Sequence, residues 1–262
     1  TIILSWTECL TAIEEKNAPL HPHVPPGDFH NNLLISPHHN YVFANNPKVA
    51  CTTTRKLLID AEFGEVRPFV ERADILHYKE FLPFLNVWQM GDFPAFVANP
   101  AVFKFCFVRN PYTRLLSGYL DKIVRGEPQK QNILEFIGKA DDPNTEIDFP
   151  TFVRTVCEMP VLKQDPHWRV QYYQTYQDGI DYDFIGKFEN LEADLRAAAD
   201  RIGIADFITP TTFGAAGKSS RGHATEANKS VQRYYTPELR DTVRQAFSKD
   251  FVSFGYDESL PS

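Results

Sequence analysis

Residues 45–58 read NNPKVACTTTRKLL and follow a short β-prone run, YVFA, at 41–44. Asn-Asn-Pro closes the run, as expected where a strand ends in a turn. The next segment, TTTRKLLIDAEFG (52–64), begins with threonines, carries apolar residues at helical spacing and ends in glycine. We therefore predict a strand, a loop and a helix that stops before Gly64.

A second unit repeats this order. VFKFCFV (102–108) is a nearly continuous apolar strand, and PYTRLLSGYLDKIV (111–124) is a helix with proline near its start. A strand that is apolar on both faces is typical of a parallel sheet covered by helices. Four later segments continue the pattern: a helix at 149–159, a strand running into a turn at 182–191, a helix at 191–203 and a closing helix at 236–257.

The chain contains no internal repeat and no linker long enough to divide two domains. Prolines and histidines crowd residues 17–40, so we predict an irregular N-terminal arm at 1–34. The remainder, 35–262, is predicted to be a single α/β domain with a central parallel sheet flanked by helices. At 262 residues, with 43% apolar residues, the chain can bury one large core.

The net charge of −7 argues against a broad surface for nucleic acid or membranes, so an anion site must be local. The four cysteines are scattered and form no CxxC pair, which disfavours structural zinc and dense disulfides. No apolar run is long enough to span a bilayer. We expect a cytoplasmic protein, with the Golgi lumen as the alternative if a membrane anchor precedes Thr1.

Five histidines near the N-terminus raise the question of a metal site: His21, His23, His30, His38 and His39. They have no carboxylate or cysteine partner at a recognised ligand spacing, so we predict no metal.

The loop at 45–50 has the features of an anion site. Between a parallel strand and a helix, backbone N–H groups converge and the positive end of the helix dipole points outward. Lys48 adds a charge, and the hydroxyls of Thr52, Thr53 and Thr54 can donate hydrogen bonds. The alternative is that the threonines only cap a helix. Neither GxxxxGK[ST] nor GxGxxG occurs, which disfavours an ATP-dependent kinase and a dinucleotide enzyme.

In the second unit, Arg109 follows the strand directly and Ser117 lies about two helical turns further on. They are about 12 Å apart along a helix, so they can share a ligand only if Arg109 reaches back from the strand end. The alternative is that Arg109 and Arg114 form ordinary ion pairs.

Together, the two segments resemble the sulfotransferases that use 3′-phosphoadenosine 5′-phosphosulfate. YVFANNPKVACTTTRKLL is similar to their 5′-phosphosulfate loop, and FKFCFVRNPYTRLLSGYLDK is similar to their 3′-phosphate motif. The resemblance is closest to the carbohydrate sulfotransferases of the chondroitin 4-O and HNK-1 type and their bacterial relatives. It extends over about 35–257 through DPHWRVQ (165–171) and the closing helix. The chain departs from the family pattern at Thr54 and Asn110.

The resemblance implies a P-loop-like nucleotide-binding fold and a transfer that needs no metal. It implies that Lys48 stabilises the leaving group, that Arg109 and Ser117 hold the 3′-phosphate, and that the loop at 215–230 covers the nucleotide. The remaining cofactor-binding residues would be Val49, Ala50, Cys51, Thr52 and Thr53 at the 5′ end, and Lys218, Ser220 and Arg221 in the covering loop.

The acceptor would be a glycan or another hydroxylated small molecule, and its general base is undecided between His77 and His167, with Glu80 as a further alternative. His77 lies where related uronyl sulfotransferases carry a catalytic histidine, and is favoured. Two other functions remain open at this point: a nucleotide or small-molecule kinase, and a non-catalytic nucleotide-binding module. The sequence does not set the oligomeric state.

Overall fold

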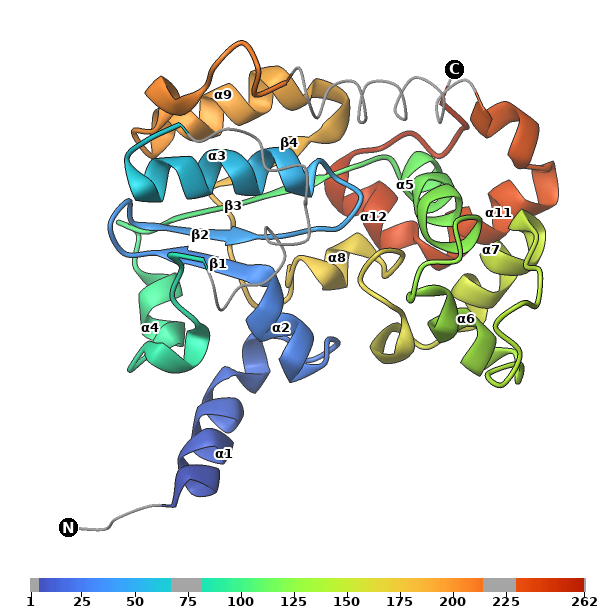
Figure 1. The fold of residues 1–262 in the computed structure, drawn as a ribbon, viewed down its shortest axis with the longest axis horizontal. Coiled ribbons are helices and arrows are strands. Elements are labelled where there is room, and N and C mark those ends of the chain that lie inside the picture. The colour runs from blue at the N-terminus through green and yellow to red at the C-terminus, as the bar shows by residue number, and fades with distance from the viewer. Residues whose placement is uncertain (1–4, 67–81, 214–229, 262) are drawn as a thin grey trace.

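The computed structural model describes residues 5–66, 82–213 and 230–261 (Figure 1). At its centre is a four-stranded sheet in the order β1-β2-β3-β4. The strands are β1 (Leu33–Ser36), β2 (Tyr41–Ala44), β3 (Phe103–Val108) and β4 (Phe184–Lys187). β2, β3 and β4 are parallel, whereas β1 is antiparallel to β2. The carboxyl ends of the three parallel strands therefore lie at one edge of the sheet.

Helices cover both faces of the sheet, as predicted. On one face, α3 (Cys51–Phe63) and α9 (Leu191–Arg201) pack against Phe43, Phe105 and Phe107. On the other, α2 (Pro26–Asn32) and α4 (Phe93–Ala98) pack against the opposite side chains of the same strands. Figure 1 shows α3 and α9 together on one side of the strands. Strands buried on both faces explain the continuous apolar run in β3.

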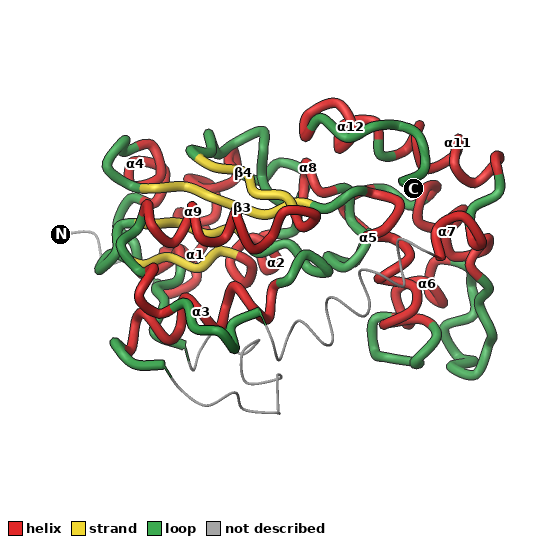
Figure 2. The backbone as a smooth tube through the Cα atoms, turned by 90° about the horizontal axis from the view of Figure 1, so that it is seen from above, coloured by secondary structure: helices red, strands yellow, loops and turns green. Residues whose placement is uncertain are grey.

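A third apolar cluster contains no residue of the sheet and is built mainly by helices. It is formed by α5 (Pro111–Gly118), α6 (Lys130–Phe136), α7 (Phe149–Glu158), α11 (Pro237–Ala246) and α12 (Ser248–Phe254). Trp168 is fully buried in it. Figure 2 shows the strands at one end of the molecule and α6, α7 and α11 at the other. The loops that leave β2 and β3 thus run between the sheet and this group of helices.

Shorter elements complete the described chain. A π-helix (Tyr119–Ile123) continues α5, and α8 (Gln171–Gln174) precedes β4. Short 3-10 helices span Ala18–Leu20, Val87–Gln89, Val161–Lys163, Phe188–Asn190 and Ala205–Phe207. No helix among the described residues is long and apolar enough to span a membrane, and both localisations considered from the sequence stay predictions. All four cysteines are free thiols.

Two local expectations were wrong. The described part of the segment 1–34, residues 5–34, is not irregular, because it contains α1 (Trp6–Asn17) and α2, and β1 already begins at Leu33. Ser5 and Glu8 form a capping box that starts α1, and burial of Phe29 fixes α2 against the sheet. The closing segment is two helices rather than one, with the break at Phe247 between α11 and α12.

Candidate active site

The loop between β2 and α3 is an open backbone cradle. Lys48 (φ 69°) and Ala50 (φ 52°) both adopt the left-handed conformation, which costs a non-glycine residue about 1–3 kcal/mol and is concentrated at functional sites. Within the described chain, no acceptor is hydrogen-bonded to the backbone N–H groups of residues 49–53. Alternating backbone conformations of this kind form anion-binding nests. The cradle therefore presents several donors at the positive end of α3.

The threonines do not cap this helix. Its N-cap is Ala50, and no side chain makes the cap hydrogen bond. Thr52, Thr53 and Thr54 instead lie in the first turn of α3, where Thr54 is fully buried and its Oγ1 has no partner among the described residues. The capping alternative raised by the sequence is thus wrong, and the donors of the first turn remain available to a ligand.

Lys48 is held by a carboxylate from a distant part of the chain. Its Nζ lies 2.8 Å from Asp121 Oδ2, and Lys122 and Arg125 each lie 3.3 Å from the same carboxylate. Burial lowers the pKa of Lys48, against the opposing effect of Asp121. Burial also resists ionisation of Asp121, but the charges of Lys48 and Lys122 outweigh it and lower the pKa of Asp121 to about 2. Asp121 is therefore an anion at neutral pH that neutralises Lys48.

Arg109 is buried, and it contacts this loop. Its Nη1 donates to the backbone oxygen of Lys48 (3.2 Å), and its Nε donates to Thr113 Oγ1 (3.0 Å). The guanidinium lies 4.2 Å from the ring centre of Phe188. Its Nη2 is buried and has no partner among the described residues. Burial lowers the pKa of Arg109 to about 10, so it stays charged at neutral pH and its Nη2 can donate to a ligand.

The sequence left open whether the Arg109 guanidinium can reach back from the strand end toward Ser117. Thr113 and Ser117 are four residues apart in α5 and therefore lie on one face of the helix. The bond to Thr113 brings the guanidinium back from the end of β3 onto that face. Ser117 is itself buried, with 8% of its surface exposed. The guanidinium of Arg109 is thus bonded to a side chain that lies one helical turn before Ser117 in α5.

Arg114 has a structural role that the sequence did not reveal. Its guanidinium donates to the backbone oxygens of Pro47 (3.1 Å), Arg169 (2.8 Å) and Pro166 (2.8 Å). Its partners are carbonyls rather than the carboxylates of an ion pair. Arg114 therefore ties the Lys48 loop to the segment at 165–169, which carries His167.

Gln171 bonds to residues that follow β2 and β3. Its Oε1 accepts from the Arg109 backbone N–H (2.9 Å) and from Asn46 Nδ2 (2.9 Å), while its Nε2 donates to the Arg109 oxygen (2.7 Å). Asp250, fully buried, accepts from the backbone N–H groups of Gln171 and Tyr172. Burial raises the pKa of Asp250 to about 6. This network fixes the backbone on both sides of the cradle.

His167 forms an oriented pair with Asp165. Its Nδ1 lies 2.7 Å from Asp165 Oδ1, and 23% of its side chain is exposed. Its backbone oxygen is 3.4 Å from where a Cβ on Gly118 would stand, so the segment packs closely on α5. Pairing through Nδ1 leaves Nε2 as the ring nitrogen available to another group.

Four of the predicted site residues lie outside the described residues: His77, Lys218, Ser220 and Arg221. The same holds for Glu80. Their predicted roles stay predictions. Three residues that bond to the candidate site were not predicted from the sequence: Asp121, Gln171 and Asn46. Gln171 stands in DPHWRVQ, but nothing local indicated that it bonds to the end of β3.

Comparison with known proteins identifies the family. The sequence model of the sulfotransferase family matches residues 31–257. The chain belongs to the sulfotransferase family. Among these sulfotransferases, carbohydrate sulfotransferase 11 of Mus musculus is 24% identical over 258 residues, which covers 90% of this chain and 69% of the relative. Carbohydrate sulfotransferase 10 of Xenopus laevis is 27% identical, with 87% and 68% covered.

A third relative, carbohydrate sulfotransferase 14 of Danio rerio, is 28% identical over 186 residues, covering 66% of this chain and 48% of the relative. No solved structure matches. Membership of the sulfotransferase family confirms the enzyme class and the α/β fold predicted from the two loops, and it removes the support for a kinase.

Proposed function

We propose that this protein transfers a sulfuryl group from 3′-phosphoadenosine 5′-phosphosulfate to a hydroxyl group of a glycan. The observation that carries the proposal is the contact between the two loops: Arg109 donates to the backbone oxygen of Lys48 beside N–H groups that have no acceptor in the described chain. A bisphosphorylated nucleotide carries anionic groups at two separated positions, and two cationic loops side by side suit such a ligand. The names of the relatives support the carbohydrate acceptor.

The chain offers two groups of donors for the nucleotide. Lys48, the N–H groups of residues 49–53 and the hydroxyls of Thr52 and Thr53 suit the 5′-phosphosulfate. Arg109, through its unused Nη2, and Ser117 suit the 3′-phosphate. In this proposal, Lys218, Ser220 and Arg221 close over the bound nucleotide. The buried Nη2 supports the fit, because a buried donor without an acceptor is rare in folded proteins.

When bound, the donor supplies the sulfuryl group. The acceptor oxygen forms a bond to sulfur as the bond from sulfur to the bridging phosphate oxygen breaks, and Lys48 stabilises the negative charge that develops on that oxygen. Lys48 must first exchange Asp121 for the donor, which replaces one anionic partner by another. Lys48 thus has an anionic partner both without and with the bound donor. Burial of this site strengthens the electrostatic interaction in each case.

The acceptor hydroxyl must lose its proton to a base, and we propose His167 Nε2 for this step, with His77 as the other candidate. Asp165 orients the ring through Nδ1 and would stabilise the imidazolium that forms, as a carboxylate does behind a catalytic histidine. The link from Arg114 to both Pro47 and Pro166 supports His167, because it joins this segment to the Lys48 loop.

The experiment is a transfer assay with the sulfate donor and a panel of glycans that includes chondroitin, dermatan and neutral oligosaccharides. We expect release of 3′-phosphoadenosine 5′-phosphate and sulfate on at least one glycan. His167→Ala should lower kcat by about 100- to 10,000-fold if His167 is the base, with donor affinity unchanged. His23→Ala is the matched control, since His23 also faces a carboxylate, Asp178, at 3.5 Å.

Loss of kcat in His77→Ala but not in His167→Ala would reassign the base to His77. Hydrolysis of the donor without transfer to any glycan in the panel would contradict the proposed class of acceptor.

A further inference from the structure

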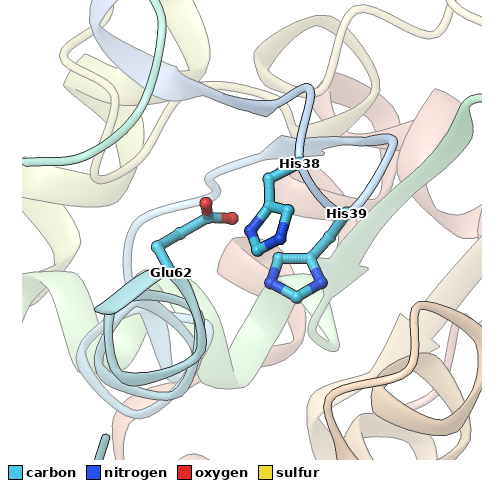
Figure 3. Close-up of side chains that lie close together, drawn as sticks. All are labelled: His38, His39 and Glu62. Atoms are coloured by element: carbon cyan, nitrogen blue, oxygen red, sulfur yellow. The ribbon is translucent and has the colours of Figure 1, made fainter. Parts of the chain in front are cut away.

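Two histidines and a glutamate meet at the end of the sheet opposite to the candidate active site. His38 and His39 lie in the turn between β1 and β2, and Glu62 lies near the end of α3 (Figure 3). The cradle follows the carboxyl end of β2, whereas this turn precedes its amino end. α3 spans the distance between them, which is roughly 16 Å at 1.5 Å per residue. The cluster is therefore separate from the nucleotide site.

The three side chains face one another without being bonded to one another. One ligand atom from each of His38, His39 and Glu62 lies within 4.8 Å of the other two. The imidazole ring centres are 4.4 Å apart. In the described chain, no hydrogen bond or ion pair joins any two of the three, and the buried Nε2 of His39 has no partner. A buried ring nitrogen without a partner needs an explanation, and a missing ion is one of those that recur in proteins.

Neighbouring groups hold two of these ligands in place. The hydroxyl of Tyr41 donates to Glu62 Oε1 (3.1 Å), and the backbone N–H of His39 donates to Ser36 Oγ (3.0 Å). Tyr41 is fully buried, so its hydroxyl is a fixed donor. Hydrogen bonds behind the ligands orient them in most protein metal sites.

We propose that His38, His39 and Glu62 bind a divalent transition-metal ion, of which Zn²⁺ is the best match. Two imidazole nitrogens and a carboxylate are a ligand set that zinc uses, with water at the fourth position. Tetrahedral zinc brings its ligand atoms to about 3.4 Å from one another, so side-chain rotations that draw them together by at most about 1.4 Å suffice. The ion would join the β1–β2 turn to the end of α3 and stabilise the sheet edge there.

The sequence did not indicate Glu62 as a partner of the two histidines, because it lies more than twenty residues from them. Other N-terminal histidines also have carboxylate partners, since His30 pairs with Glu14 and His23 faces Asp178. Among the described residues, however, only the cluster of His38, His39 and Glu62 brings three such ligands together. We therefore replace the expectation of no metal, which was based on the spacing of histidines in the sequence alone.

The test is calorimetric titration of Zn²⁺ into the metal-free full chain at neutral pH, with thermal unfolding measured in parallel. We expect one equivalent to bind and the melting temperature to rise by at least about 2 °C. His38→Ala, His39→Ala and Glu62→Gln should each weaken binding at least about tenfold, since even the groups behind metal ligands contribute that much. Glu62→Gln keeps an oxygen acceptor for Tyr41, so its effect reports the lost charge and ligand.

His23→Ala is the control, because it removes a histidine and its carboxylate contact elsewhere and should leave Zn²⁺ binding unchanged. The proposal is overturned if the wild type binds no Zn²⁺, or if the three variants bind it as tightly as the wild type does. It is also overturned if His23→Ala loses as much affinity as His39→Ala. Binding of 3′-phosphoadenosine 5′-phosphate should be the same with and without Zn²⁺, so the result does not depend on the proposed function.

Discussion

Lys48→Ala is expected to lower the rate of sulfuryl transfer by about 100- to 1,000-fold, the usual cost of removing one group that stabilises charge in a transition state. Affinity for 3′-phosphoadenosine 5′-phosphate should fall by less than about tenfold, because the backbone donors and Arg109 remain. Single-turnover reactions measure the rate constant of the transfer step, and calorimetry measures the affinity for the bisphosphate.

Arg125→Ala is the matched control for Lys48→Ala. Arg125 also pairs with Asp121, but more than half of its side chain is exposed, so its loss removes a cation without altering the cradle. We expect its activity to stay within about threefold of the wild type, as for exposed ion pairs in general. Equal losses of activity in both variants would show that the loss results from breaking an ion pair with Asp121 and not from removing the charge of Lys48. Full activity of Lys48→Ala would exclude Lys48 from the reaction.

Arg109→Ala is expected to weaken binding of 3′-phosphoadenosine 5′-phosphate by about 100-fold or more. Hydrogen bonds from a charged donor contribute about 1.5–3 kcal/mol each, and Arg109 has a buried donor to offer. Arg109→Lys should recover only part of the affinity, since an ammonium group cannot reproduce the fork of a guanidinium. Calorimetric titration with the bisphosphate measures both variants.

Because Arg109 also bonds to the Lys48 oxygen and Thr113, its variants need a check on folding. Arg196→Ala is the matched control: its guanidinium also lies over a phenylalanine ring, Phe213, at 5.4 Å, and half of its side chain is exposed. We expect normal binding in Arg196→Ala. A folded Arg109→Ala that binds the bisphosphate as tightly as the wild type would contradict the assignment of the 3′-phosphate to Arg109.

The elements that the sequence predicted correctly are those with local signals. Asn-Asn-Pro after YVFA marks the end of β2, and Gly64 ends α3 in the left-handed conformation that glycine favours. The apolar run in β3 predicts a strand covered on both faces, and the structure confirms it. The antiparallel direction of β1 has no such signal, because all four of its residues are buried and the run does not alternate.

The contacts that make the site come from residues far apart in the sequence, and no local pattern encodes them. Asp121 is 73 residues from Lys48, and Gln171 is 62 residues from Arg109. Asn110, where the chain departs from the family pattern, makes one local and one distant contact. Asn110 caps α5 through its side chain, and its backbone N–H donates to Glu189. The two loops predict candidate hydrogen-bond donors from the sequence alone, whereas the groups that orient these side chains are identified only from the fold.

Thermal unfolding of the wild-type protein with 3′-phosphoadenosine 5′-phosphate, compared with ATP and Mg²⁺, tests whether the two loops form a site for the sulfate donor. A ligand that binds only the folded state raises its stability, so the bisphosphate at about 100 times its Kd should raise the melting temperature by about 5–10 °C. ATP with Mg²⁺ should produce little or no rise. No rise with the bisphosphate, or a rise with ATP and Mg²⁺ alone, would contradict a donor site built from the Lys48 loop and Arg109.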